Sequence, residues 1–184
     1  MCLSLSPMEN TTYLETVRAI LTFAMPPVRL QYLRFDGHLC KFLAAGCFKK
    51  LTQTFSHLRI LCLTKLDLDD FNVFCFTINM VQNCPYIKYL ELSSITPNKS
   101  VLQHKFDYDN NFKLRHLLKA KITGITGSSA ELKLVEYIVG ISVKLTRFLF
   151  KCNNLDPSSE LKVLRELLQL PRASKKAKLV CLAQ

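Results

Sequence analysis

Leucines recur in the stretch "LRILCLTKLDL", Leu58 to Leu68, at intervals that fit neither a simple strand nor a simple helix. The steps are three, two, three and two residues, whereas a strand repeats a face every second residue and a helix about every 3.6 residues. The same L-x-x-L-x-L spacing, with other apolar residues in some places, starts again at Leu30, Ile87, Leu117 and Leu145. These starts lie 28, 29, 30 and 28 residues apart, and a weaker sixth match begins at Ala177. Such even steps predict a chain built from internal repeats.

Two of the segments between the repeated strands begin with a capping box, in which Ser or Thr lies three residues before Glu. Thr12 and Glu15 precede a helical run that Pro26 ends, which predicts a helix over about 12–24. Ser128 and Glu131 precede a second helical run. That run has apolar residues at Leu134, Ile138 and Ile141.

Two further helices are predicted from aspartate N-caps. Asp69 or Asp70 can cap the first, and Asp156, followed by Pro157, suits the start of the second. The first carries apolar residues on one face at Phe71, Phe74, Ile78 and Val81, and the second at Leu161, Leu164 and Leu168. Segments 38–56 and 97–111 show no clean helical pattern, so we expect long loops on the side of the stack away from the sheet.

Strand, turn and helix repeated in this order predict an α/β fold, in which parallel strands form one sheet and helices cover its other face. Steps of 28 to 30 residues lie at the upper end of leucine-rich-repeat lengths, so we expect a leucine-rich-repeat solenoid. A single repeat cannot bury its leucines without neighbours. Because each buried leucine contributes about 1.5 to 3 kcal/mol, a five-repeat stack can form an independent unit.

Composition places the chain among folded proteins without a disulfide framework. Of its 184 residues, 49% are hydrophobic, and its eight cysteines are scattered singly with no C-x-x-C pair. Such cysteines are mostly small buried hydrophobes in a reducing compartment. His38, Cys40 and Cys47 lack a fourth ligand at zinc spacing, so we predict no metal site. The N-terminus has no basic region typical of a secretory signal, which favours a cytoplasmic or nuclear protein without a membrane partner.

The formal charge of +11 suggests acidic partners, such as nucleic acid, anionic lipid or an acidic protein face. The basic residues are spread along the whole chain rather than gathered in one arm. Diffuse charge of this kind is typical of a solvated surface, so nucleic acid is the weaker candidate.

The sequence offers no arrangement typical of an enzyme. Gly124 and Gly127 lie in "TGITGSS", which matches neither a P-loop nor a dinucleotide-binding motif. Asp67, Asp69 and Asp70 form an acidic cluster, but the EF-hand pattern is absent. We therefore predict no catalytic residues and no cofactor.

The residues between the repeated leucines are the candidate binding site. Because the leucines point into the core, the intervening residues on the sheet face meet a partner. The predicted contacts are Tyr32, Arg34, Arg59 or Ile60, Cys62, Lys88, Tyr89, Glu91, Lys119, Lys121, Arg147, Leu149 and Lys151. Alternating basic and aromatic residues suit an acidic protein segment or a bound anion. The alternative is that these lysines only keep exposed strands soluble.

Several segments resemble the plant F-box/FBD/leucine-rich-repeat family. "KITGITGSSAELKLVEYIVGISVKLTRFLF" is similar to the opening of the FBD region, and "SSELKVLRELLQLPRASKKAKLVCL" to its closing helix, Arg-Ala-Ser element and final strand. "RFDGHLCKFLAAG" and "CPYIKYLEL" resemble the repeat part of the same proteins. The resemblance covers about Leu30 to Leu182. It implies a leucine-rich-repeat region over 1–112, with an incomplete first repeat, and an FBD region over 113–184 that continues the stack.

This resemblance also implies a function. Proteins of this family would be target-recognition subunits of cullin-RING ubiquitin ligases, in which an F-box binds a Skp-type adaptor and the repeats bind a target. No F-box pattern is found before Leu30, and the chain has no Trp. We therefore expect a protein-interaction module with an unidentified target, and a Skp-type adaptor only for a longer form with an F-box. The alternatives are a basic solenoid that binds nucleic acid or another anion, and a vestigial truncated product.

Overall fold

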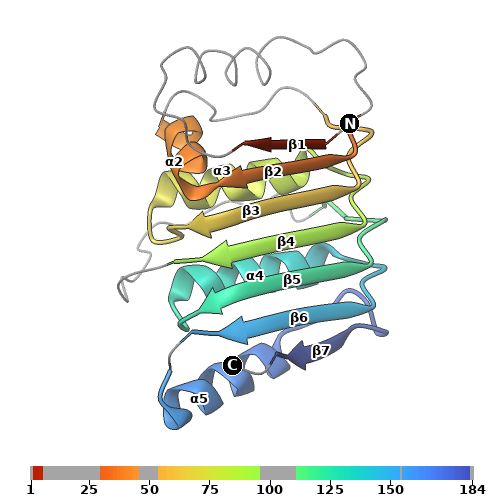
Figure 1. The fold of residues 1–184 in the computed structure, drawn as a ribbon. Coiled ribbons are helices and arrows are strands. Elements are labelled where there is room, and N and C mark those ends of the chain that lie inside the picture. The colour runs from red at the N-terminus through yellow and green to blue at the C-terminus, as the bar shows by residue number, and fades with distance from the viewer. Residues whose placement is uncertain (1, 6–29, 46–53, 96–110, 154, 183–184) are drawn as a thin grey trace.

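One parallel sheet runs through the whole described structure. The computed structural model describes residues 2–5, 30–45, 54–95, 111–153 and 155–182. Its seven strands are hydrogen-bonded in chain order and all ladders are parallel (Figure 1). The strands are β1 (Cys2–Leu5), β2 (Tyr32–Asp36), β3 (Ile60–Leu66), β4 (Tyr89–Ser94), β5 (Lys119–Ile125), β6 (Arg147–Cys152) and β7 (Lys178–Cys181). The predicted α/β fold with a parallel sheet is confirmed.

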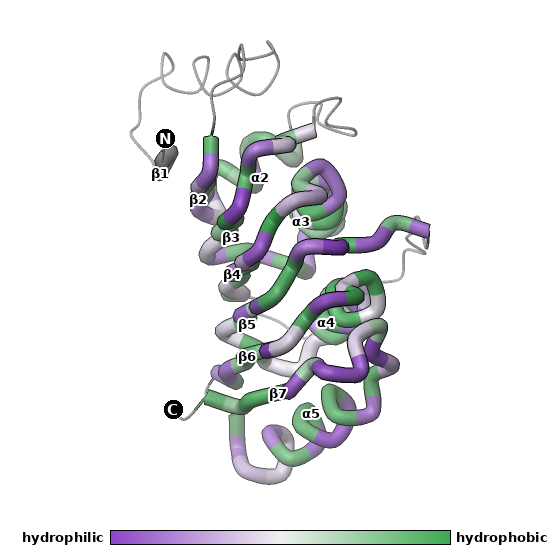
Figure 2. Tube along the Cα trace, turned by 90° about the vertical axis from the view of Figure 1, so that its right-hand side faces the viewer, coloured by the Kyte–Doolittle hydropathy of each residue, from purple (hydrophilic) through white to green (hydrophobic). Residues whose placement is uncertain are grey.

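The described helices pack along one face of this sheet (Figure 2). They are α2 (Gly37–Ala45), α3 (Phe71–Gln82), α4 (Ser129–Ile141) and α5 (Pro157–Gln169). No helix of the described residues lies on the opposite face (Figures 1 and 2). We call this uncovered side of the sheet the free face. The predicted helix over 12–24 lies outside the described residues, as does the predicted loop over 97–111 except for its last residue.

The repeat predicted from the leucine spacing corresponds to the strand register of the sheet, because equivalent residues of successive repeats lie side by side on neighbouring strands. One core position is aligned across neighbouring strands, at the buried residues Leu33, Leu61, Leu90, Ala120 and Phe148 and at the partly buried Leu179. The weak sixth match thus forms a strand, β7, but its register is off by one residue: a start at Ala177 puts Val180 at this position, where the structure has Leu179. Leu3 of β1 lies opposite Leu33. The sequence search missed β1 because "CLSL" carries only the L-x-L half of the repeated spacing.

The irregular leucine spacing of β3 follows from a bulge. Leu63 and Leu66 are both fully buried although they are three residues apart, and the pairing of β3 with β4 shifts register between them. Lys65 adopts φ 56°, a left-handed conformation that turns the backbone at this point. Gly124, with φ 82°, lies at a similar register shift in β5.

Three of the four helix starts predicted from capping residues are confirmed, and the fourth, at Thr12, lies outside the described residues. Asp70 caps α3, Ser128 and Glu131 form the capping box of α4, and Asp156 caps α5 with Pro157 in the first turn. Ser158 and Ser159 donate hydrogen bonds to the Asp156 carboxylate, which holds its pKa well below the usual range.

Two predictions about the helix layer are wrong. Part of the expected loop over 38–56 is a helix, α2, because Asp36 accepts a hydrogen bond from the Leu39 N–H at 3.0 Å and caps the first turn. The apolar face assigned to α5 is wrong at two of its three positions, although Leu164 does pack against the core. Leu161 and Leu168 are 48% and 56% exposed, while the helix packs through Val163 and Leu167.

Candidate functional site

Strand alternation places two rows of side chains on the free face. Successive residues of a strand point to opposite sides of a sheet, so the neighbours of the buried leucines face away from the helices. The first row is Tyr32, Ile60, Tyr89, Lys119, Arg147 and Lys178, and the second is Arg34, Cys62, Glu91, Lys121, Leu149 and Val180. Each member lies opposite the next across neighbouring strands, so the rows run across the strands along the sheet.

Most of the predicted contact residues lie in these rows, and Lys151 follows Leu149 by two residues on β6. Arg59 and Lys88 do not, because each lies one residue before its strand, at the edge of the sheet. The Arg59 guanidinium donates to the carbonyl oxygens of Ser56 and Leu58, both at 3.0 Å. It also lies 5.8 Å from the ring centroid of Tyr86. Local contacts therefore hold Arg59 at this edge.

Two members of the rows, Lys178 and Val180, were not among the predicted contacts. Both belong to β7, whose weak sequence match lacks the full L-x-x-L-x-L pattern. The available signal was the alternation of "KLVC", in which Leu179 is packed against the core while its two neighbours are exposed.

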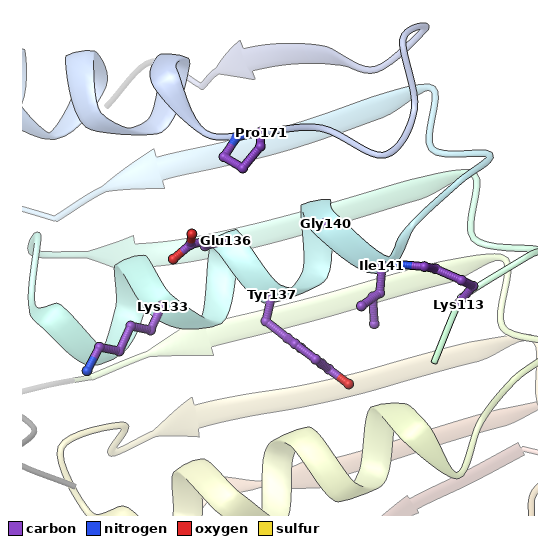
Figure 3. Close-up of a pocket in the computed structure, with 7 residues that line it drawn as sticks. All are labelled: Lys113, Lys133, Glu136, Tyr137, Gly140, Ile141 and Pro171. Atoms are coloured by element: carbon purple, nitrogen blue, oxygen red, sulfur yellow. The ribbon is translucent and has the colours of Figure 1, made fainter. Parts of the chain in front are cut away.

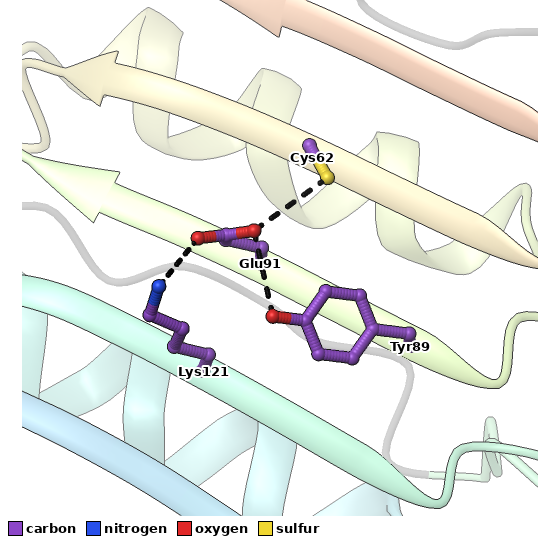
Figure 4. A network of polar contacts seen from close by, with 4 residues as sticks. All are labelled: Cys62, Tyr89, Glu91 and Lys121. Carbon is purple, nitrogen blue, oxygen red and sulfur yellow. Dashed lines mark hydrogen bonds and ion pairs between the residues drawn. The ribbon is translucent and has the colours of Figure 1, made fainter. Parts of the chain in front are cut away.

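Glu91 is the centre of a polar network on the free face (Figure 4). One oxygen, Oε1, accepts from Lys121 Nζ at 2.9 Å. The other, Oε2, is within hydrogen-bonding reach of the Tyr89 hydroxyl at 3.4 Å and of Cys62 Sγ at 3.9 Å. The Lys121 and Glu91 side chains are 31% and 29% exposed. An ion pair this accessible contributes little stability, so its main effect is to fix both side chains.

The hydroxyl and thiol groups of this network stay protonated at neutral pH. Burial, with the nearby Glu91 carboxylate, raises the pKa of Tyr89 to about 12. Burial also raises the pKa of the Cys62 thiol. Tyr89 and Cys62 therefore serve as hydrogen-bond donors to Glu91. Cys62 was predicted as a partner contact, but it is only 3% exposed, so it supports Glu91 rather than presenting a contact surface.

The free face becomes cationic towards β7. Lys119 lies opposite Arg147, and Arg147 lies opposite Lys178. Among the described residues, no carboxylate pairs with any of these three side chains. The Lys119 ammonium lies 5.6 Å from the ring centroid of Tyr89, a cation–π distance.

A small cavity lies on the other side of the molecule, in the helix layer (Figure 3). It has a volume of about 270 Å³ and is lined by Lys113, Lys133, Glu136, Tyr137, Gly140, Ile141 and Pro171. Gln82 Nε2 donates to the Tyr137 hydroxyl at 2.8 Å. Lys133 and Lys113 lie at opposite ends of the lining (Figure 3), and the lining contains no Ser, Cys or His. This cavity therefore lacks the paired nucleophile and base typical of a hydrolytic site.

Two other kinds of site are absent from the described part of the chain. There, no group of three or more His, Cys, Asp or Glu side chains is arranged to hold a metal ion. No helix among the same residues has the length and apolar character needed to cross a membrane.

Comparison with known proteins gives one informative similarity. No protein-family model matches the chain, and no solved structure matches it. The chain is 26% identical over 138 residues to an F-box/FBD/LRR-repeat protein of Arabidopsis thaliana. The aligned region covers 72% of this chain and 33% of that relative, so the chain spans about a third of the relative's length. This similarity confirms the resemblance to the plant F-box/FBD/leucine-rich-repeat family.

Proposed function

We propose that this chain is a non-catalytic protein-interaction module, a leucine-rich-repeat solenoid whose free face binds a target protein. One observation carries the proposal: strands β2 to β7 align two rows of polar, aromatic and cationic side chains on a sheet face that no described helix covers. A rigid sheet backed by helices holds such side chains at fixed spacing, which lowers the entropy lost on binding.

The chemistry of the face suits binding better than catalysis. Tyr89 and Cys62 are held protonated and donate to Glu91. Glu91 in turn pairs with Lys121. These groups satisfy one another, whereas a general base or nucleophile needs a free reactive atom beside a substrate site.

The family resemblance supports a more specific role. The Arabidopsis relative is named for an F-box, an FBD region and leucine-rich repeats. We propose that the corresponding part of this chain recognises a target for a cullin-RING ubiquitin ligase. A Skp-type adaptor would bind only a form that carries an F-box, and the ligand of the chain itself would be the target.

Affinity purification with paired variants tests the proposed function. The tagged chain would be compared with a free-face variant, Arg34→Glu, and a helix-layer variant, Lys162→Glu. Both residues are exposed, and both substitutions change the net charge equally. We expect at least one co-purifying protein to be lost with the first variant and kept with the second. Equal recovery with both variants, after circular dichroism shows cooperative melting of each, would count against binding through the free face.

Nucleic acid is a second candidate ligand, favoured by the net charge of +11 and by the cationic end of the free face. Charge-driven binding weakens steeply as salt rises from about 50 to 200 mM. A filter-binding titration over that range tests this candidate. An absence of binding at the lowest salt would eliminate it.

A further inference from the structure

We propose that the part of the free face formed by β5, β6 and β7 binds a target segment that alternates acidic and apolar residues. We call this part the β5–β7 surface. The inference rests on the proposed function, since it assigns a chemical class to the target. It places the segment across the strands, along the direction of the two rows.

The cationic row of this surface lacks compensating charge. Lys119, Arg147 and Lys178 lie directly opposite one another on three neighbouring strands. Adjacent strands are about 4.7 to 4.9 Å apart, and like charges directly opposite one another destabilise a sheet. No described carboxylate pairs with these three side chains. A row of mutually repelling cations on a rigid surface is therefore complementary to a ligand with several negative charges.

An apolar strip lies beside the cationic row. Leu149 lies opposite Val180, two residues further along β6 and β7 than Arg147 and Lys178. Val180 is 39% exposed, and Leu149 is half-buried. Covering this strip with apolar side chains lowers the free energy, because it removes apolar surface from water. On β5 the second row carries Lys121, which pairs with Glu91, so the apolar strip is confined to β6 and β7. There the two rows together fit a ligand with acidic groups along one edge and apolar groups along the other.

The same surface is poorly suited to single-stranded nucleic acid. Proteins that bind single strands stack bases on aromatic rings, but the free-face residues of the two rows on β5, β6 and β7 include no aromatic side chain. The nearest ring in the rows, Tyr89 on β4, is already in contact with Lys119 and Glu91. A polypeptide that alternates acidic and apolar residues matches both the cationic row and the apolar strip, whereas a nucleic acid matches only the cationic row.

A peptide titration tests this assignment. The probes are a short fluorescein-labelled peptide of alternating Glu and Leu, the matched peptide of alternating Glu and Ser, and a labelled oligouridylate. The full chain would be compared with the double variant Arg147→Glu/Lys178→Glu and with the helix-layer control Lys162→Glu/Arg165→Glu. All four substituted residues are exposed, so the two variants carry the same net charge at equally accessible positions.

We expect the Glu-Leu peptide to bind more tightly than the Glu-Ser peptide. The β5–β7 double variant should weaken that binding by about tenfold or more, while the control variant binds nearly as well as the unmodified chain. Equal loss with both variants, or no preference for the Glu-Leu peptide, would overturn the inference. Tighter binding of the oligouridylate would overturn it in favour of nucleic acid. If the peptide fails to bind while Arg34→Glu still removes a co-purifying protein, this inference fails and the proposed function stands.

Discussion

Glu131 should be among the most important polar residues for the stability of this fold. Its Oε1 accepts from the Ser94 hydroxyl at 2.6 Å, and its Oε2 accepts from the backbone N–H groups of Thr126, Gly127 and Ser128 at 2.8, 3.0 and 3.1 Å. The carboxylate is buried, so it joins β4 to the turn before α4 with little competition from water. One side chain thus connects two consecutive repeats.

Removing this carboxylate takes an acceptor from five donors, because the Thr126 hydroxyl also donates to Oε2, at 3.1 Å. Each buried donor left unsatisfied costs about 1 to 3 kcal/mol. Because water reaches part of the turn, the total is smaller than the full sum, and we expect Glu131→Ala to lower the free energy of unfolding by about 3 kcal/mol or more. At this chain length, that corresponds to a melting temperature lower by about 6 to 12 °C. Glu131→Gln keeps a carbonyl oxygen for the turn and an amide that can donate to Ser94. It should therefore cost only about 1 kcal/mol.

Urea unfolding followed by far-ultraviolet circular dichroism measures these changes as shifts of the midpoint at constant slope. Glu136 provides the control, because it lies on the same helix and is exposed. Glu136→Ala should change stability by less than about 0.5 kcal/mol. The reasoning is refuted if Glu131→Ala and Glu136→Ala have the same midpoint.

Three further predictions test the core, the backbone and the free face. Leu61→Asp places an unpaired charge at a fully buried position and should prevent cooperative melting. Lys65→Asp changes an exposed residue of the bulge, so this variant should melt nearly as the unmodified chain does. Similar melting curves for the two variants would show that the assigned strand register is wrong. Gly124→Ala should destabilise by about 2 kcal/mol or more, because φ is +82° and the new Cβ would lie 2.1 Å from a backbone oxygen. Gly140→Ala should be neutral or stabilising by up to about 1 kcal/mol, since a Cβ there has open space. A lower urea midpoint for Gly140→Ala than for Gly124→Ala would contradict both predictions. Tyr89 should ionise near pH 12, because burial and the nearby Glu91 carboxylate raise its pKa, and the corresponding phenolate absorbance should be lost in Tyr89→Phe. An ionisation near its usual pKa of 10.0 would contradict the burial of Tyr89 beside Glu91.

The fold was largely predictable from sequence because its signals are local and repeated. The even spacing of the leucines gave the strand positions, and the Ser128–Glu131 and Asp156 caps gave two helix starts. The bond from Ser94 to Glu131 was not predictable, because it joins residues 37 positions apart. The helix α2 was missed because its cap, Asp36, is the last residue of β2, so no turn signal separates the strand from the helix.

The candidate site was predictable as a face but not as a set of contacts. Alternation along each strand identified Tyr89, Lys119 and Arg147 as residues that point away from the core. Whether a position on that face is accessible depends on neighbouring strands. Cys62 is covered while it contacts Glu91 of the next strand, and the guanidinium of Arg59 is held by nearby carbonyls. Such effects arise from packing between repeats, which spacing within one repeat does not encode.

Site-directed photocrosslinking tests the central claim, that a target protein binds the free face, most directly. A photoreactive residue would replace Tyr32 or Val180 on the free face, or Leu161 on the outer side of α5. Val180 and Leu161 are exposed, and Tyr32 is half-buried. The protein whose co-purification depends on Arg34 would be the target in each reaction. The account predicts crosslinks to that protein from a free-face position and none from Leu161. Crosslinks from Leu161 with none from either free-face position would contradict it.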